Sequence, residues 1–140
     1  MHLRIDSIEQ ALRDSELVKS EMTDAGYRVA YLIALDNLLA GKVVIADSVN
    51  PISITRNAWS DIAKRAGARA IEVEIVCSDQ TEHRRRVETR TGDIPGSTLP
   101  TWDEVIAREY HPWDHEHLVI DTAKVGVDEG VAAIRDAAKL

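Results

Sequence analysis

Four short apolar runs, separated by helical patterns, constrain the fold of this chain more than any other feature. The unbroken run Val43-Val44-Ile45-Ala46 ends in Asp47, which is typical of a strand buried on both faces of a parallel sheet. Strand patterns that alternate with helical patterns favour an α/β domain with a parallel sheet and helices on both faces. We expect four parallel strands, at residues 2–5, 43–47, 70–76 and 117–121.

Helical signals fill the intervals between these runs. Gly41 follows a long apolar stretch at the position where helices commonly stop. Asp79 with Glu82, and Thr101 with Glu104, have the spacing of capping boxes, which open helices. We expect helices over residues 7–13, 23–40, 53–66, 79–90, 101–110 and 127–140, with a loop between residues 91 and 100.

Length and composition indicate one globular domain that comprises residues 1–140, because 44% apolar and 29% charged residues are ordinary globular usage. The 24 acidic and 17 basic side chains give a net charge of −7, a field that repels phosphate backbones. We therefore expect no nucleic-acid partner. Nothing approaches the roughly 20 consecutive apolar residues that cross a bilayer, so we expect no membrane partner and a cytoplasmic location.

Acidic residues follow three of the expected strands. Asp6 and Asp47 each end a strand, and the last strand runs into Asp121 and Thr122. In open α/β sheets, the carboxyl edge of the strands is where ligands bind. Acids at this edge are also common as helix caps or loop formers, so spacing alone leaves both interpretations open.

The order of the segments is more specific than any one of them. The run His2-Leu3-Arg4-Ile5-Asp6, the run from Val43 to Asn50, the arginine-rich helix and the run Val119-Ile120-Asp121-Thr122 together resemble P-loop kinases. The resemblance is to those related to polynucleotide kinase, zeta toxins and gluconate kinase, many of them known only as AAA-type ATPases or predicted kinases. It covers nearly all of the chain and implies a three-layer P-loop NTPase-like sheet.

The resemblance also implies roles for the residues at the strand ends. Asp6 matches the acid that orients the acceptor hydroxyl and takes its proton during phosphoryl transfer from ATP. Asp47 matches an acid that holds Mg²⁺ through water or orders the site, and Asn50, beside it on the turn, is expected to contact acceptor or metal. Asp121 and Thr122 are expected to contact ATP.

A lid over residues 79–110 completes the implied site. Arg86 and Arg90 lie four residues apart on its helix, so we expect them to form the pair that contacts the phosphates. Arg84 and Arg85 point elsewhere and are expected to be solvated. The alternative is that the whole arginine run is a solvated basic face.

Two departures from the family pattern limit the resemblance. Glu9 stands where family members often carry an arginine that grips a phosphate on the acceptor, which favours an uncharged hydroxyl compound. The phosphate-binding pattern G-x-x-x-x-G-K-[ST] begins at none of the seven glycines. In the family, a strand, this loop and a helix precede the segment matched by residues 2–6. We therefore expect the true reading frame to begin upstream of Met1.

The strand that the resemblance finds missing is the central one, between the strands that end near Asp47 and Cys77. Its absence predicts a slot, with flanking strands roughly 9–10 Å apart in place of the usual 4.8 Å. Alternatively, the half-sheets close together or another chain fills the gap, which is a route to self-association.

The sequence favours an ATP-dependent small-molecule kinase that is inactive without its phosphate-binding loop. The alternative is a non-catalytic remnant or interaction module of the same fold. A third class, the α/β hydrolases, is not favoured because the chain has no G-x-S-x-G nucleophile motif. The polar segment with His111, His115 and His117 is expected to be a connector, because its spacing matches no established metal-ligand pattern.

Overall fold

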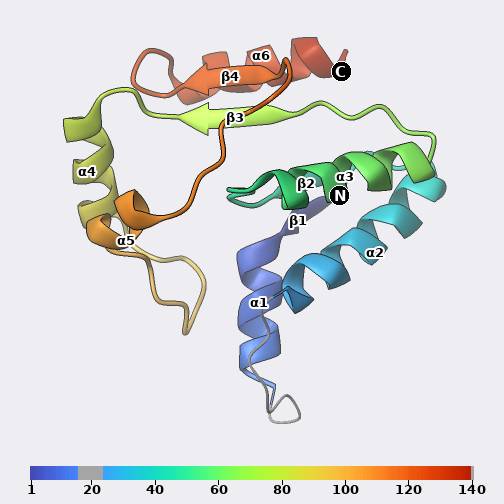
Figure 1. Ribbon diagram of the computed structural model, residues 1–140, viewed down its shortest axis with the longest axis horizontal. Coiled ribbons are helices and arrows are strands. Elements are labelled where there is room, and N and C mark those ends of the chain that lie inside the picture. Colours follow the sequence, from blue (N-terminus) through green and yellow to red (C-terminus); the bar gives the residue numbers. More distant parts are fainter. Residues whose placement is uncertain (16–23, 140) are drawn as a thin grey trace. The chain divides into compact units, whose positions relative to one another are not determined.

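The computed structural model describes residues 1–15 and 24–139, which form short strands and longer helices (Figure 1). The elements in chain order are β1 (His2–Arg4), α1 (Ile5–Arg13), α2 (Ala25–Leu39), β2 (Ile45–Asp47), α3 (Ser53–Arg65), β3 (Val73–Val76), α4 (Gln80–Thr89), α5 (Trp102–Ala107), β4 (Leu118–Asp121) and α6 (Val127–Ala138).

The chain divides into two compact units. Unit 1 comprises Met1–Arg69, Gly92–Thr98 and Glu109–His111, and unit 2 comprises Ala70–Thr91, Leu99–Arg108 and Pro112–Leu140. Each unit is built around one pair of strands. The prediction that residues 1–140 form a single domain, with a lid over 79–110, stays a prediction.

All four strands are parallel to their partners, as the sequence predicted. In unit 1, β1 pairs with β2 in the register His2↔Ile45 to Arg4↔Asp47. In unit 2, β3 pairs with β4 in the register Val73↔Leu118 to Val76↔Asp121. The described residues thus form two sheets of two strands, and in these residues β2 and β3 share no ladder.

The strands are shorter and more exposed than the apolar runs predicted. All three residues of β2 are exposed, and Val43, which precedes the strand, is 56% exposed. In β4, Ile120 is buried whereas Val119 is 50% exposed, so only one face of this strand is covered. The prediction that Val43 to Asp47 form a strand buried on both faces was wrong for the described residues, because no second layer covers β2.

The core of unit 1 lies between β1, α2 and α3. Leu3, Ala34 and Ile62 are buried together, with Tyr31 and Trp59 packed against them. The rings of Tyr31 and Trp59 meet edge to face at 4.6 Å, which is a favoured aromatic geometry. Gly26 lets α1 approach α2, because a Cβ there would lie 2.3 Å from Glu9 Cγ. The core therefore fixes β1 and the two helices that flank it.

Unit 2 is held together by smaller contacts. Gly130 of α6 packs on Ile120 of β4, where a Cβ would lie 3.4 Å from Ile120 Cγ2. Val87 on α4 is buried, and the Trp102 ring of α5 meets His83 of α4 edge to face at 5.2 Å. These contacts place α6 against β4 and α5 beside α4.

Local signals set most helix boundaries. The Asp79 side chain accepts a hydrogen bond from Glu82 N–H at 3.0 Å, and Thr101 with Glu104 forms a complete capping box. Gly41 follows α2 with φ +73°, the left-handed conformation that favours glycine. α5 ends at Ala107, three residues before the predicted end. The predicted helix start at Thr23 lies outside the described residues.

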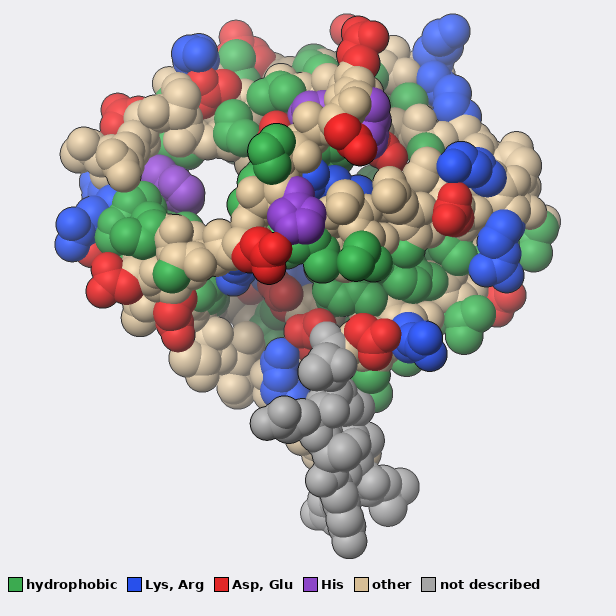
Figure 2. Space-filling view, in the orientation of Figure 1, with side chains coloured by type: hydrophobic (Ala, Val, Ile, Leu, Met, Phe, Trp, Pro, Cys, Tyr) green, Lys and Arg blue, Asp and Glu red, His purple; other side chains and the backbone are tan. Residues whose placement is uncertain are grey.

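Apolar side chains remain at the surface of unit 1. Leu32 and Leu39 of α2 are 62% and 64% exposed, and Ile54 of α3 is 72% exposed. Figure 2 shows hydrophobic side chains among charged side chains of both signs on the visible face. Among residues 1–15 and 24–139, no helix combines the length and the apolar composition that crossing a membrane requires.

Candidate functional site

The carboxyl end of the β1–β2 pair brings together the acids that the sequence singled out. Asp47 is the last residue of β2 and lies opposite Arg4 in the register. Asp6 follows two residues after Arg4, in the first turn of α1. Because α1 begins at Ile5, Asp6 lies inside this helix. The prediction that Asp6 ends a strand was wrong. A carboxylate in a first turn is also stabilised by the helix dipole.

An arginine that the sequence reasoning missed lies among these acids. Arg4 donates two hydrogen bonds to Asp93, from one terminal nitrogen to Oδ2 at 2.6 Å and from the other to Oδ1 at 2.8 Å. These bonds raise the pKa of Arg4, and the charges of Asp47 and Asp6 raise it further. Arg4 is thus ion-paired with Asp93 and lies in the field of two further acids, Asp47 and Asp6.

Asp47 also contacts the other strand of its pair. Its Oδ2 lies 3.1 Å from Nε2 of His2, and both side chains are more than half exposed. A half-exposed carboxylate is the hard oxygen donor that Mg²⁺ prefers. Asp47 thus has the chemistry of a metal ligand, although its contact in the structure is with an imidazole.

Asn50 lies in the turn that follows β2. Its φ of 45° is left-handed, a conformation that asparagine tolerates better than most residues. Its Oδ1 is buried and has no hydrogen-bond partner among the described residues. Its carbonyl accepts a hydrogen bond from Arg56 Nε at 2.9 Å. The amide oxygen of Asn50 is therefore a buried acceptor with unused capacity.

Two further polar residues of unit 1 are Glu9 on α1 and Tyr27 on α2. Glu9 accepts a hydrogen bond from Arg13 at 3.0 Å, so α1 presents a paired carboxylate at this position. Tyr27 lies beside the Ser48 side chain and the Asn50 backbone, and burial raises the pKa of its hydroxyl.

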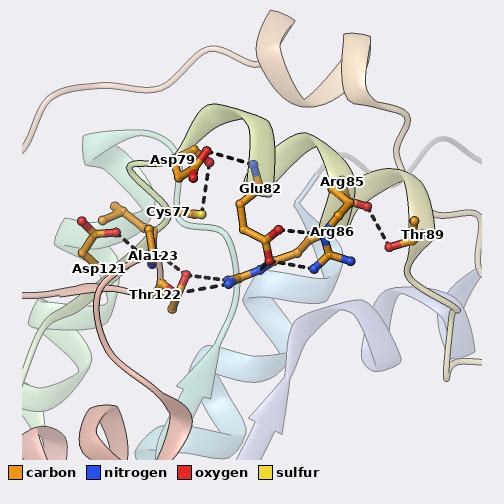
Figure 3. A network of polar contacts seen from close by, with 10 residues as sticks. Cys77, Asp79, Glu82, Arg85, Arg86, Thr89, Asp121, Thr122 and Ala123 are labelled. Carbon is orange, nitrogen blue, oxygen red and sulfur yellow. Dashed lines mark hydrogen bonds and ion pairs between the residues drawn. The ribbon is translucent and has the colours of Figure 1, made fainter.

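In unit 2, a network of polar contacts joins the ends of β3 and β4 (Figure 3). Asp121 accepts hydrogen bonds from Ser78 N–H at 2.9 Å and Ala123 N–H at 3.1 Å, and pairs with Lys124 at 2.9 Å. These partners, Ser78 first, hold the pKa of Asp121 well below its usual range. Asp121 is thus a carboxylate that orders the turn after β4.

Arg86 extends from α4 to the end of β4 in the same network. One of its terminal nitrogens donates to Thr122 Oγ1 at 3.0 Å and the other to the Thr122 carbonyl at 3.2 Å. Its Nε donates to Glu82 at 2.7 Å, and Glu82 also accepts two hydrogen bonds from Arg85. The structure thus brings Arg86 and Thr122 together, two residues that the sequence had assigned to ATP.

Arg90 lies apart from this network. It is the residue after α4, and it donates to the Pro100 carbonyl at 3.4 Å. A hollow of about 450 Å³ between α4 and α5 is lined by Arg84 and Arg90 together with Trp102 and Asp103. Arg84 is also paired with Glu88 at 2.8 Å. Arg90 therefore shares its surroundings with Arg84, whereas Arg86 points to β4.

Two histidines of the connector before β4, His115 and His117, contact acids that lie just before β3 or within it. His115 contacts Glu72 and Asp114, and His117 Nε2 lies 3.1 Å from Glu74. The His117 ring stacks on Trp113 at 4.0 Å. Within residues 1–15 and 24–139, no three metal-ligating side chains are grouped so that they could hold an ion.

No family model, no curated protein and no solved structure matches the chain. The resemblance to P-loop kinases therefore rests on the residues quoted above.

Proposed function

We propose that this chain provides the acceptor site and lid of an ATP-dependent kinase for a small, uncharged hydroxyl compound. The phosphate-binding loop would come from a segment outside these 140 residues. The pairing of the strands carries the proposal, because β1–β2 and β3–β4 are the two parallel pairs expected of the resembled fold without its central strand, which there lies between β2 and β3. The three acids and Arg4 at the carboxyl end of the first pair add support.

In the proposed reaction, Asp6 accepts a hydrogen bond from the acceptor hydroxyl and takes its proton as the γ-phosphoryl group is transferred. Asp47 and Asn50 hold the acceptor in place, and Asp47 is also the residue that would hold Mg²⁺. When bound, Mg²⁺ would offset the negative charge of the phosphates. Arg86, Arg90, Asp121 and Thr122 are the residues proposed to contact ATP.

The acceptor step is tested with Asp6→Asn in a longer protein that includes the upstream segment. We expect kcat for phosphoryl transfer to fall by roughly 10²–10⁴-fold, the usual contribution of a general base, with ATP affinity unchanged. Asp36→Asn is the matched control, because Asp36 is an exposed acid on α2. ADP release and ³¹P NMR of the product measure the reaction. An unchanged kcat in Asp6→Asn would remove Asp6 from the mechanism.

The non-catalytic alternative makes a different prediction for the same protein. If the longer protein binds Mg·ATP but transfers phosphate to no hydroxyl compound and not to water, the fold is retained without the activity. If it does not bind Mg·ATP, nucleotide binding has been lost as well. Either result replaces the kinase with an interaction module.

A further inference from the structure

Arg56 on α3 is the most deeply buried charged side chain among the described residues, with 4% of its surface exposed. Its Nε donates to the Asn50 carbonyl at 2.9 Å. One terminal nitrogen donates to the Pro51 carbonyl at 3.1 Å and to the His111 carbonyl at 2.9 Å. Its guanidinium lies over the Tyr110 ring, 4.9 Å from the centroid. A buried cation is costly unless hydrogen bonds satisfy it, so this arrangement is not incidental.

These contacts join two segments that lie 60 positions apart in the sequence, because Arg56 reaches the carbonyls of both Pro51 and His111. Further contacts reinforce the junction. His111 N–H donates to the Pro51 carbonyl at 2.8 Å, and Ser53 N–H donates to His111 Nδ1 at 3.4 Å. The turn after β2 and the segment Glu109–His111 are therefore held by the same side chain.

The turn needs this support at Asn50. A left-handed backbone costs conformational free energy for a residue with a Cβ, and it persists only where the surroundings fix it. The hydrogen bond from Arg56 is made to the Asn50 carbonyl itself. A planar guanidinium donates in several fixed directions, whereas the ammonium of lysine is a single point charge. Lysine therefore cannot reproduce the three carbonyl contacts.

We propose that Arg56 is a positioning residue that fixes the Asn50 turn at the carboxyl end of β2 and couples it to the segment Glu109–His111. The two segments order and open as one unit. The coupling stands on the contacts alone, and only its consequence for the acceptor rests on the proposed function. In that setting, Arg56 sets where the Asn50 amide lies without contacting the reacting atoms.

The test is amide hydrogen exchange of the 140-residue chain carrying Arg56→Lys, with Arg65→Lys as the control on the same helix. Arg65 is exposed, so its substitution leaves exchange unchanged. We expect exchange in residues 48–53 and in residues 109–111 to rise together by at least about tenfold, the change that follows when charge-assisted hydrogen bonds are lost. A rise in only one segment, or in neither, overturns the proposal.

A second variant approaches the junction from the other side. Tyr110→Leu keeps Arg56 but removes the ring beneath it, and it is expected to raise exchange in residues 48–53 as well. Unchanged exchange there overturns the coupling, even if Arg56→Lys fails to fold.

The consequence for catalysis is measured in the longer protein. Arg56→Lys is expected to raise the acceptor KM about five- to tenfold while the KM for ATP stays unchanged, because a uniform loss of acceptor binding appears in KM. An equal rise in both KM values overturns the positioning role. If the longer protein has no transfer activity at all, the proposed function fails, whereas coupled exchange still decides whether Arg56 joins the two segments.

Discussion

Glu82 organises the arginine-rich helix α4. It accepts hydrogen bonds from Arg85 and Arg86, which lower its pKa to about 2. The resemblance implied that Arg86 contacts phosphates, whereas in the structure this arginine donates to Glu82 and to Thr122. The spacing of three and four residues between Glu82 and these arginines could have predicted both ion pairs.

Glu82→Gln should therefore free Arg85 and loosen Arg86, which keeps its hydrogen bonds to Thr122, and so make both arginines more accessible to an anion. We expect the affinity of the chain for inorganic tripolyphosphate to rise about two- to fivefold, the range set by exposed ion pairs. Glu88→Gln is the matched control, because it releases Arg84 instead. Isothermal titration of both variants at one salt concentration measures the effect. A larger gain from Glu88→Gln would assign the anion to Arg84 and not to Arg86.

The contacts of the histidines before β4 lead us to expect that the stability of the fold depends on pH. Hydrogen bonds to Glu72 and then Asp114 raise the pKa of His115, and the His115 carbonyl followed by Glu74 raises that of His117. A raised pKa means that the folded chain binds these protons more tightly than the unfolded chain. Their stabilisation is thus fully present below about pH 6.5, the unfolded value, and is lost as pH rises through the folded values.

NMR titration of the histidine Cε1–H signals measures this directly. His115 and His117 should titrate above the values found in the urea-unfolded chain, and Glu72→Gln should move His115 back toward its unfolded value. If Glu72→Gln leaves the His115 titration in place, the contact with Glu72 is not its cause.

Contacts between distant residues mark the limit of prediction for the site. Parallel pairing was enough to bring Asp6 and Asp47 to the same end, because carboxyl ends of parallel strands lie together. The Arg4–Asp93 pair spans 89 positions and the Arg56–His111 contact 55, so no local pattern in the sequence encodes them.

At the element scale, helix starts were predictable because capping is local. Asp79 and Thr101 each accept the hydrogen bond that the sequence spacing indicated. The exposure of β2 was not predictable, because a run such as Val43 to Asp47 does not reveal whether a second layer covers it.

Removal of a cap tests the start of α4. Asp79→Ala should lower the free energy of unfolding by about 0.5–2 kcal/mol, because it leaves the Glu82 N–H without its acceptor. Thr81→Ala is the control, since Thr81 is an exposed position inside the helix. Urea unfolding followed by circular dichroism measures both variants. Equal losses in the two variants would show that the cap contributes nothing.

A substitution at the junction of β1 and α1 tests the core of unit 1. Ile5 is 1% exposed, so Ile5→Ala should cost about 2–5 kcal/mol through lost burial and the cavity left behind. Ile54→Ala, at a position that is 72% exposed, should stay within about 0.5 kcal/mol of the parent chain. Urea unfolding again measures both, and a small loss at Ile5 would mean that this junction is not part of the stable core.

For the whole molecule, the proposed kinase requires a strand between β2 and β3 and a phosphate-binding loop, and the described residues contain neither. Ile45 of β2 and Ile75 of β3 are 60% and 58% exposed, although both lie in strands. Each strand also has only one ladder partner among the described residues. A strand with one ladder partner leaves the backbone N–H and C=O groups of its other edge unpaired, and a further strand could bond to them.

Calorimetric titration with Mg·ATP tests this claim most directly. In a P-loop protein, most of the binding free energy for the phosphates comes from the loop amides, the loop lysine and the helix N-terminus. The 140-residue chain should therefore bind Mg·ATP with a Kd on the order of 1 mM or weaker, which is about 4 kcal/mol or less. A longer protein that includes the upstream segment should bind in the micromolar range, about 8 kcal/mol, under the same salt condition. Micromolar binding by the 140 residues alone would contradict the claim, because the site would then not depend on a phosphate-binding loop.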